Sequence, residues 1–206
     1  SLLKNHRVEE LRYEHPEWVL GERTAEWFAL SWNMAVPEIR KRRYDHVEEV
    51  ARRYDWDGIE LDWQRHAFHF PDDEGYRLRY LLTDLQRAIR QMTEALGAER
   101  GRPIYLAARV AGSLEMCRRI GYDVPTWIDE GLADILIPAG NAVTDASIDV
   151  AGFVELCKGT DVAVYPGFDS NLPDPFVGPE ELEDKDRLRP RAIASRYHRA
   201  GATGIY

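Results

Sequence analysis

Short apolar runs alternate with amphipathic helical segments along this 206-residue chain, and this alternation is the feature that most limits its possible folds. We expect strands at 27–32, 57–63, 103–110, 133–140 and 161–168, and the start of a sixth at 202–206. These runs are continuously apolar, which is typical of a parallel sheet covered by helices. The chain is therefore predicted to be α/β, either a doubly wound sheet or part of an eight-stranded barrel.

Helical patterns occupy the segments between these strands. We expect helices at 36–55, 74–96, 123–131, 147–159 and 189–201, with the second ending near Gly97. The first helix begins with Pro37, which suits an initial helical position. Its apolar residues recur at helical spacing: Ile39, Tyr44, Val47, Val50 and Ala51. Residues 1–26 are expected to be irregular, and residues 169–186 form a predicted loop rich in proline and acid.

Composition excludes several classes of partner. The net charge of -9 would repel a phosphate backbone, so we expect no nucleic-acid partner. No apolar run approaches the roughly 18 residues needed to span a bilayer. Neither G-x-G-x-x-G nor a P-loop follows an expected strand, which weighs against a nucleotide, and we expect no cofactor. Cys117 and Cys157 lack metal-type spacing and either pair or stay reduced.

Hydrophobic residues make up 44% of the chain, enough for one core, so we expect a single domain over 1–206. The sequence begins with Ser1 and ends in what reads as the start of a strand, so we expect a piece of a longer protein. The compartment stays open, with secretion or a periplasmic location expected if a signal peptide lies upstream. The oligomeric state is not predicted.

The stretch WDGIELDWQRHAFHF, residues 56–70, carries the densest candidate chemistry. Side chains alternate along a strand, so Glu60 and Asp62 point to the face opposite Ile59 and Leu61. Buried carboxylates are costly unless paired or used. Asp62 is expected at the carboxyl end of its strand, where barrels place active sites. The alternative is structural: Glu60 paired with an arginine, for which Arg109 is the obvious candidate.

Polar residues also follow other expected strands. They are Trp32 with Asn33, Asn141, and Tyr165 with Asp169. Polar groups gathered at one end of several strands are what a sugar-sized pocket needs. Taken singly, residues of these types at strand ends are more often ordinary loop residues; the grouping is what indicates a pocket.

Residues 33–66, NMAVPEIRKRRYDHVEEVARRYDWDGIELDWQRH, resemble the stretch shared by family-10-like glycosyl hydrolase domains. The motifs EHPEW, ARV, ILIPAG, VYPGFDS and GATGIY resemble later parts of such barrels. The resemblance implies a (β/α)8 TIM-type barrel, incomplete here because its early strands are missing. It also implies glycoside hydrolysis, with Asp62 at the family's acidic position.

A second resemblance is to the family 18 glycoside hydrolases, whose strand motif is D-G-x-D-x-D-x-E. The same frame here holds Asp57, Gly58, Glu60, Asp62 and Gln64. Gln64 stands where that family has its catalytic acid, and an amide cannot donate a proton as a carboxylic acid does. A relative of that family with this sequence would be inactive by that mechanism.

The predicted reaction uses two carboxyl groups. Asp62 is one; Glu60 positions it or raises its pKa, and the second acid comes from another strand end, with Asp169 the best visible candidate. The expected substrate-binding residues are Arg65, His66, Arg109, Asn141, Trp32, Asn33, Tyr165 and Trp63. The tryptophans would stack on a sugar, with core packing as the alternative.

Two other functions remain open. The first is a carbohydrate-binding barrel without catalysis, favoured by Gln64 and by the lack of a clear second acid. The other is a metal-dependent hydrolase using Asp62, His66 and His69, although Arg65 disfavours a cation there. We expect no metal.

Overall fold

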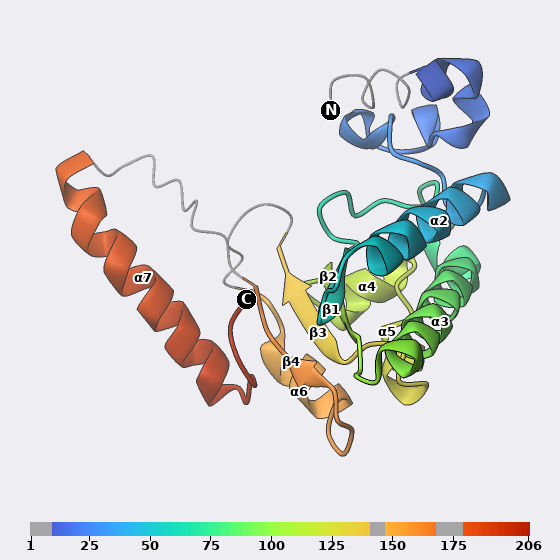
Figure 1. Ribbon diagram of the computed structural model, residues 1–206. Helices are drawn as coiled ribbons and strands as arrows, with labels where there is room; N and C mark the ends of the chain where they lie inside the picture. Colours follow the sequence, from blue (N-terminus) through green and yellow to red (C-terminus); the bar gives the residue numbers. More distant parts are fainter. Residues whose placement is uncertain (1–9, 141–146, 168–178) are drawn as a thin grey trace.

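The computed structural model describes residues 10–140, 147–167 and 179–206. Its sheet has four parallel strands in sequential order: β1 (Gly58–Asp62), β2 (Tyr105–Ala111), β3 (Ile135–Ala139) and β4 (Ala163–Val164). Every neighbouring pair is parallel, so the predicted α/β class with a parallel sheet is confirmed (Figure 1). In the register, Asp62 lies opposite Arg109 and Arg109 lies opposite Ile137.

Helices connect the strands. They are α2 (Pro37–Arg53), α3 (Gly75–Arg100), α4 (Leu114–Ile120), α5 (Val124–Asp129), α6 (Val150–Leu156) and α7 (Pro179–Arg199). Three short 3-10 helices precede α2: η1 (Pro16–Trp18), η2 (Gly21–Arg23) and η3 (Glu26–Phe28). In Figure 1, α7 lies apart from α2 and α3, beyond β4 and α6. No described helix is long and apolar enough to cross a membrane.

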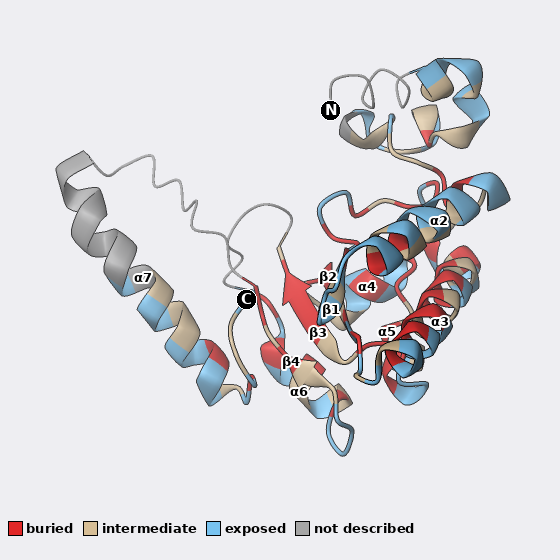
Figure 2. Ribbon diagram, in the orientation of Figure 1, coloured by how far each residue is buried: buried red, intermediate tan, exposed pale blue. Residues whose placement is uncertain are grey.

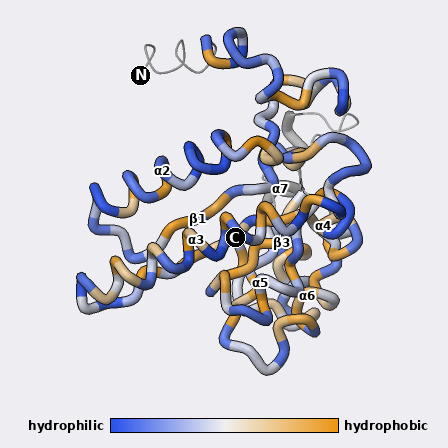
Figure 3. Tube along the Cα trace, turned by 90° about the vertical axis from the view of Figure 1, so that its right-hand side faces the viewer, coloured by the Kyte–Doolittle hydropathy of each residue, from blue (hydrophilic) through white to orange (hydrophobic). Residues whose placement is uncertain are grey.

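The core lies between one face of the sheet and the helices (Figure 2). Its large buried members are Trp63, Leu82, Ile89, Leu106, Tyr122, Trp127, Leu136 and Phe153. In β1, Leu61 is buried and Ile59 half-buried, whereas Glu60 and Asp62 are exposed. Figure 3 shows α2 mostly in blue, as expected for a helix with one face in solvent. The predicted alternation of faces in β1 is confirmed, and it leaves Glu60 and Asp62 on the side away from the helices.

The long helix α3 buries a stripe at intervals of three and four residues. The stripe consists of Leu78, Leu82, Leu85, Ile89, Met92 and Leu96. The predicted end near Gly97 is wrong: the helix continues to Arg100, and Gly101 follows with φ +69. Gly97 serves packing instead, because a Cβ there would lie 2.9 Å from the carbonyl oxygen of Arg102.

Helix α4 was not predicted, although its ends carry recognisable signals. Ser113 caps it, accepting a hydrogen bond from the amide of Met116 at 3.2 Å, and Gly121 follows it with φ +99. Its last turn packs closely on the start of α3: a Cβ on Gly75 would lie 2.5 Å from the carbonyl oxygen of Arg119. Helix α4 has only seven residues, which is too short for a helical period to be recognised in the sequence.

The predicted strand at 27–32 is wrong. Residues 26–28 form η3, and only Trp32 makes a bridge, an antiparallel one with Val19. The amides of Leu20 and Gly21 donate to the carbonyls of Ser31 and Ala29, so this apolar stretch closes a local turn rather than joining the sheet.

The end of the chain also differs from prediction. The helix expected at 189–201 already begins at Pro179, within the predicted loop, and β4 is only two residues long. Residues 202–206 are not assigned as a strand, yet they run beside β4. The amide of Thr203 donates to Val164 at 2.9 Å and that of Tyr206 to Pro166 at 3.2 Å. Four of the six expected strands are therefore present in the described residues.

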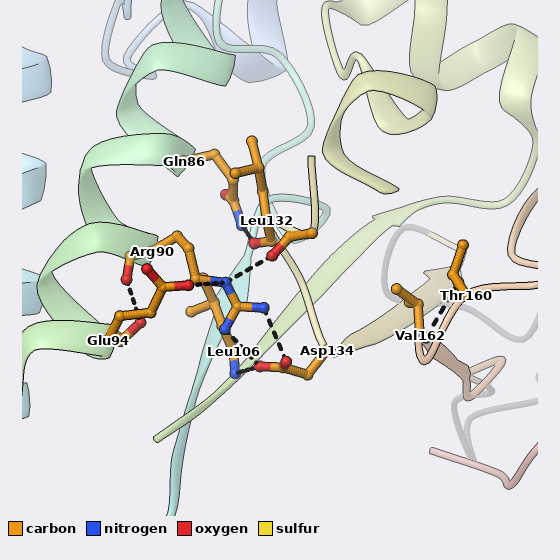
Figure 4. Close-up of polar contacts among 10 residues, drawn as sticks. Gln86, Arg90, Glu94, Leu106, Leu132, Asp134, Thr160 and Val162 are labelled. Atoms are coloured by element: carbon orange, nitrogen blue, oxygen red, sulfur yellow. Dashed lines mark hydrogen bonds and ion pairs between the residues drawn. The ribbon is translucent and has the colours of Figure 1, made fainter. Parts of the chain in front are cut away.

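A charged clasp fixes α3 to the strands. Arg90 on α3 donates from both terminal nitrogens to Asp134, each at 2.9 Å, and from Nε to the carbonyl of Gly131 (Figure 4). Asp134 also accepts from the amide of Leu106 on β2 at 2.6 Å. One turn earlier, Gln86 donates to the carbonyl of Leu132 at 3.0 Å.

Candidate functional site

Asp62 closes β1 on the exposed face of the sheet, opposite Arg109 of β2. Nη1 of Arg109 donates to both carboxylate oxygens of Asp62, at 3.1 and 3.0 Å. The ion pair is partly sheltered, because the Asp62 side chain is 35% exposed and that of Arg109 only 14%. Because the ion pair is partly buried, it is stronger than a fully exposed pair. Asp62 nevertheless remains in contact with solvent.

Backbone amides hold Asp62 in one orientation. Its Oδ1 accepts from the amides of Gln64 and Arg65, each at 3.0 Å, as the chain turns out of the strand. Its Oδ2 receives only the bond from Arg109 among the described contacts. One carboxylate oxygen is thus committed to the turn, and the other faces the open side with a single donor.

Glu60 lies one pleat deeper on the same face. Its Oε1 accepts a hydrogen bond from the hydroxyl of Tyr206 at 3.0 Å. The pKa of Glu60 is raised, chiefly by burial of part of its side chain and also by the nearby charge of Asp62, while Tyr206 and Arg109 lower it. The alternative prediction that Glu60 pairs with Arg109 is wrong, because Arg109 bonds to Asp62.

Arg109 joins this cluster to the end of β3. Its Nη2 donates to the carbonyl of Gly140 at 3.2 Å, while its Nε is buried and has no partner in the described part of the chain. The side chain therefore has a donor left over beside Asp62. Because this Nε is buried, the donors of Arg109 that bond on the open face are the two terminal nitrogens, which already bond to Asp62 and Gly140.

Two predicted binding residues prove to be structural. Trp63 is 3% exposed and lies in the core, where its Nε1 donates to Gln86 at 3.3 Å. Asn33 is also buried, and its side-chain oxygen accepts from the amide of Ala35 at 2.9 Å, which shapes the turn before α2. Both side chains are buried and bonded within the protein, so the structure does not present them to a ligand.

The other predicted residues divide into three groups. Trp32 and His66 line a hollow of about 300 Å3 beside the loop that follows β1. Arg65 is exposed, and Tyr165, half-buried, packs its ring against Gly204. Asn141 and Asp169 lie outside the described residues, so the candidate second acid is not placed.

The proposed metal ligands do not form a ligand set. In the described residues no three His, Cys, Asp or Glu side chains are grouped to hold a metal ion. His69 is buried and its Nε2 lies 3.0 Å from the carbonyl of Trp63, whereas His66 is exposed. Burial lowers the pKa of His69 to about 4, so this imidazole is neutral at physiological pH.

Sequence reasoning missed Tyr206 as a member of the cluster. The only signal was the expected strand at 202–206, which would run beside its predecessor. The hydroxyl reaches Glu60 across the open face, from the opposite side of the four strands. A strand's neighbour can be predicted, but a contact that depends on curvature of the sheet cannot.

No protein-family model matches the chain, and a search of curated proteins finds no match.

Proposed function

We propose that this protein is a glycoside hydrolase that uses Asp62, at the carboxyl end of β1, as an essential carboxylate. The observation that carries the proposal is the pair of carboxyl groups on one open face, in opposite environments. Asp62 is paired with Arg109, whereas Glu60 is partly buried, accepts a hydrogen bond from Tyr206 and has a raised pKa. Glycosidic bond cleavage uses carboxyl groups held in different environments; in this proposal Asp62 is one of them and Glu60 positions it.

The same proposal includes a (β/α)8 barrel, of which this sheet is an arc. Three features support it: the strands follow one another in sequential order, the helices cover one face, and Tyr206 reaches Glu60 across the other. In a barrel the open face becomes the lumen and the end of β1 becomes the rim that holds active sites. A second acid, for which Asp169 remains the candidate, would approach from that rim.

The substrate proposed is a poly- or oligosaccharide. Arg65, His66 and Trp32 lie on the segments beside Asp62 and offer hydrogen bonds and an aromatic surface to a sugar. Because two amides fix Oδ1 of Asp62 and Arg109 donates to Oδ2, the carboxylate is held in one orientation before a sugar binds.

The test compares wild type with Asp62→Asn on aryl glycosides and on plant and algal polysaccharides, using the full-length protein. Asparagine keeps an oxygen for the amides of Gln64 and Arg65 but removes the charge. We expect hydrolysis to fall by about 100-fold or more. The matched control is Asp161→Asn, the same change at an exposed position, which should leave the rate unaltered. Equal turnover by wild type and Asp62→Asn would remove Asp62 from the mechanism.

A carbohydrate-binding barrel without catalysis is the second candidate. It is favoured by Gln64, which is 6% exposed and whose side-chain oxygen has no partner in the described residues, standing where one glycosidase family has its acid. Saccharide binding by wild type with no turnover of any substrate in the screen would favour this second function.

A further inference from the structure

A hollow of about 300 Å3 beside the loop after β1 is lined by basic and aromatic side chains, and we call it the cationic pocket. Its side chains include those of Arg12, Trp32, Arg43, His66, Phe68 and His69. No carboxylate is among the described residues that line it, although the chain carries a net charge of -9. An acidic protein with an acid-free basic pocket concentrates its positive potential in one place.

Among the described residues, the two arginines of the pocket have no anionic partner. No ion pair links Arg12 or Arg43 to a carboxylate in the described ranges. Arg12 places its guanidinium 5.1 Å from the centre of the Trp32 ring, and its Nε is buried without a hydrogen-bond acceptor there. A buried N–H donor without a hydrogen-bond acceptor destabilises the folded protein, so an acceptor is expected to pair with it.

Positive groups converge at the base of the pocket. Burial lowers the pKa of His69 most and the charges of Arg43 and His66 lower it further, whereas the carbonyl of Trp63 and the charge of Asp62 raise it. Arg43 and Trp32 also form walls of a neighbouring hollow of about 220 Å3, which adds Arg42 and His46. The positive surface thus continues from the cationic pocket along α2.

We propose that the cationic pocket binds the anionic substituent of a sugar ring, a carboxylate or a sulfate or phosphate ester, while the ring stacks on Trp32. Paired arginines match the oxygens of such groups, and a tryptophan face suits the apolar side of a sugar. The pocket adjoins the candidate site: His66 follows Arg65, whose amide donates to Asp62. In naming an acidic saccharide as the substrate class, this inference rests on the proposed function; the binding of the anion itself does not.

The experiment measures binding of glucuronate, glucose, inorganic sulfate and inorganic phosphate to the full chain by calorimetric titration. We expect glucuronate to bind at least tenfold more tightly than glucose, and each inorganic anion to bind more weakly than glucuronate. Binding of a sulfated or phosphorylated sugar in place of glucuronate, tighter than the free anion, also supports the proposal. Equal binding of glucuronate and glucose, or inorganic anions binding as tightly as every charged sugar, would overturn it.

Three variants test whether glucuronate binds through the arginines of the cationic pocket or through the overall charge of the protein. Arg43→Gln should weaken glucuronate binding about tenfold or more, since it removes a charge-assisted contact. Arg12→Gln provides a second, independent loss if the first variant fails to fold. Arg53→Gln, the same change on the same helix at a side chain 64% exposed, should bind like wild type. Unchanged binding by a folded Arg43→Gln or Arg12→Gln contradicts the proposal.

Asp62→Asn distinguishes failure of the pocket from failure of catalysis. This variant should still bind glucuronate, because Asp62 does not line the pocket. Binding by wild type without hydrolysis of any acidic saccharide would leave the cationic pocket standing and refute the hydrolase.

Discussion

At the scale of single residues, the loop that follows β1 depends on a neutral imidazole. His69 is packed between Trp63 and Tyr122, with ring centres 5.5 and 5.7 Å away. The hydroxyl of Tyr122 lies 2.6 Å from the carbonyl of Trp63 and 3.1 Å from that of Ala67, so the side chains of Tyr122 and His69 together satisfy the carbonyls of this turn. A proton added to His69 would place a charge in this buried cluster.

We therefore expect acid to destabilise the protein through His69. Its pKa is lowered from 6.5 to about 4 in the folded protein. Between these values only the unfolded chain binds the proton, so the free energy of unfolding falls as the pH is lowered, by about 3 kcal/mol in total. Urea unfolding at several pH values between 7 and 4 measures this fall.

The control is His69→Gln, whose amide can still donate to the carbonyl of Trp63 but does not titrate. Glu60 has a raised pKa and acts in the opposite direction, because the folded form then binds the extra proton. The difference between wild type and variant isolates His69. A difference that stays constant with pH would contradict the prediction.

The position of Glu60 and Asp62 on one face could be predicted from alternation alone, since it needs only the period of a strand. Their partners could not. In the structural alternative Arg109 is the predicted partner of Glu60, but the register sets it opposite Asp62. Trp63 was placed near the sugar although the next side chain in the alternation belongs to the core. Predicting partners requires the register between strands, which no single strand contains.

At the scale of elements, the clasp of Arg90 and Asp134 ties α3 to two strands. Asp134 bonds to Arg90 of α3 and to the amide of Leu106 in β2, and its own carbonyl accepts from Ala163 in β4 at 2.9 Å. The Arg90 side chain is only 13% exposed, so removing its partner leaves a sheltered charge. Asp134, between α5 and β3, thus fixes the position of α3 relative to the sheet.

Asp134→Ala should lower the free energy of unfolding by about 2–4 kcal/mol, because both Arg90 and the amide of Leu106 lose an acceptor. Urea unfolding followed by circular dichroism measures the change. The comparison is Asp84→Ala, whose side chain is 59% exposed where it bonds to Arg87. That variant should change stability by less than about 1 kcal/mol. Similar losses in the two variants would show that the clasp has no special role.

Elements with a full period were predictable, and short or apolar-rich ones were not. The stripe of α2 contains several turns, and its start at Pro37 was confirmed. In contrast, residues 27–32 have the apolar content of a strand but fold into η3 and a turn, because their backbone bonds stay local. Gly97 was read as a stop although its lack of a Cβ serves packing inside α3.

At the scale of the whole molecule, both thiols lie within the packed interior. Cys117 and Cys157 are free and buried, and burial raises their pKa values to about 12 and about 11. Sγ of Cys117 donates to the carbonyl of Ala111 at 3.4 Å. The question of whether they pair, which the sequence left open, is answered by the structure: they do not.

We expect native protein to leave both thiols unreacted with Ellman's reagent, since reaction requires an accessible thiolate. In guanidinium without reductant, two thiols per chain should react. The rate in the native state should track global unfolding, because both side chains lie in one core. Rapid reaction of native protein, or fewer than two thiols after denaturation, would contradict the described packing.

The general architecture was within reach of the sequence because alternation and apolar runs dictate a covered parallel sheet. The curvature of that sheet could not be predicted from the sequence, because it arises from the twist between neighbouring strands. The contact between Tyr206 and Glu60 depends on it, and so does the composition of the open face.

The hydrogen bond from Tyr206 to Glu60 joins positions 146 residues apart. Closing so long a stretch of chain is entropically unfavourable until the intervening segments have compacted. The carboxylate face should accordingly be the last part to acquire its native neighbours during refolding. A partly folded intermediate would have a packed core, while Glu60 would not yet be in contact with Tyr206.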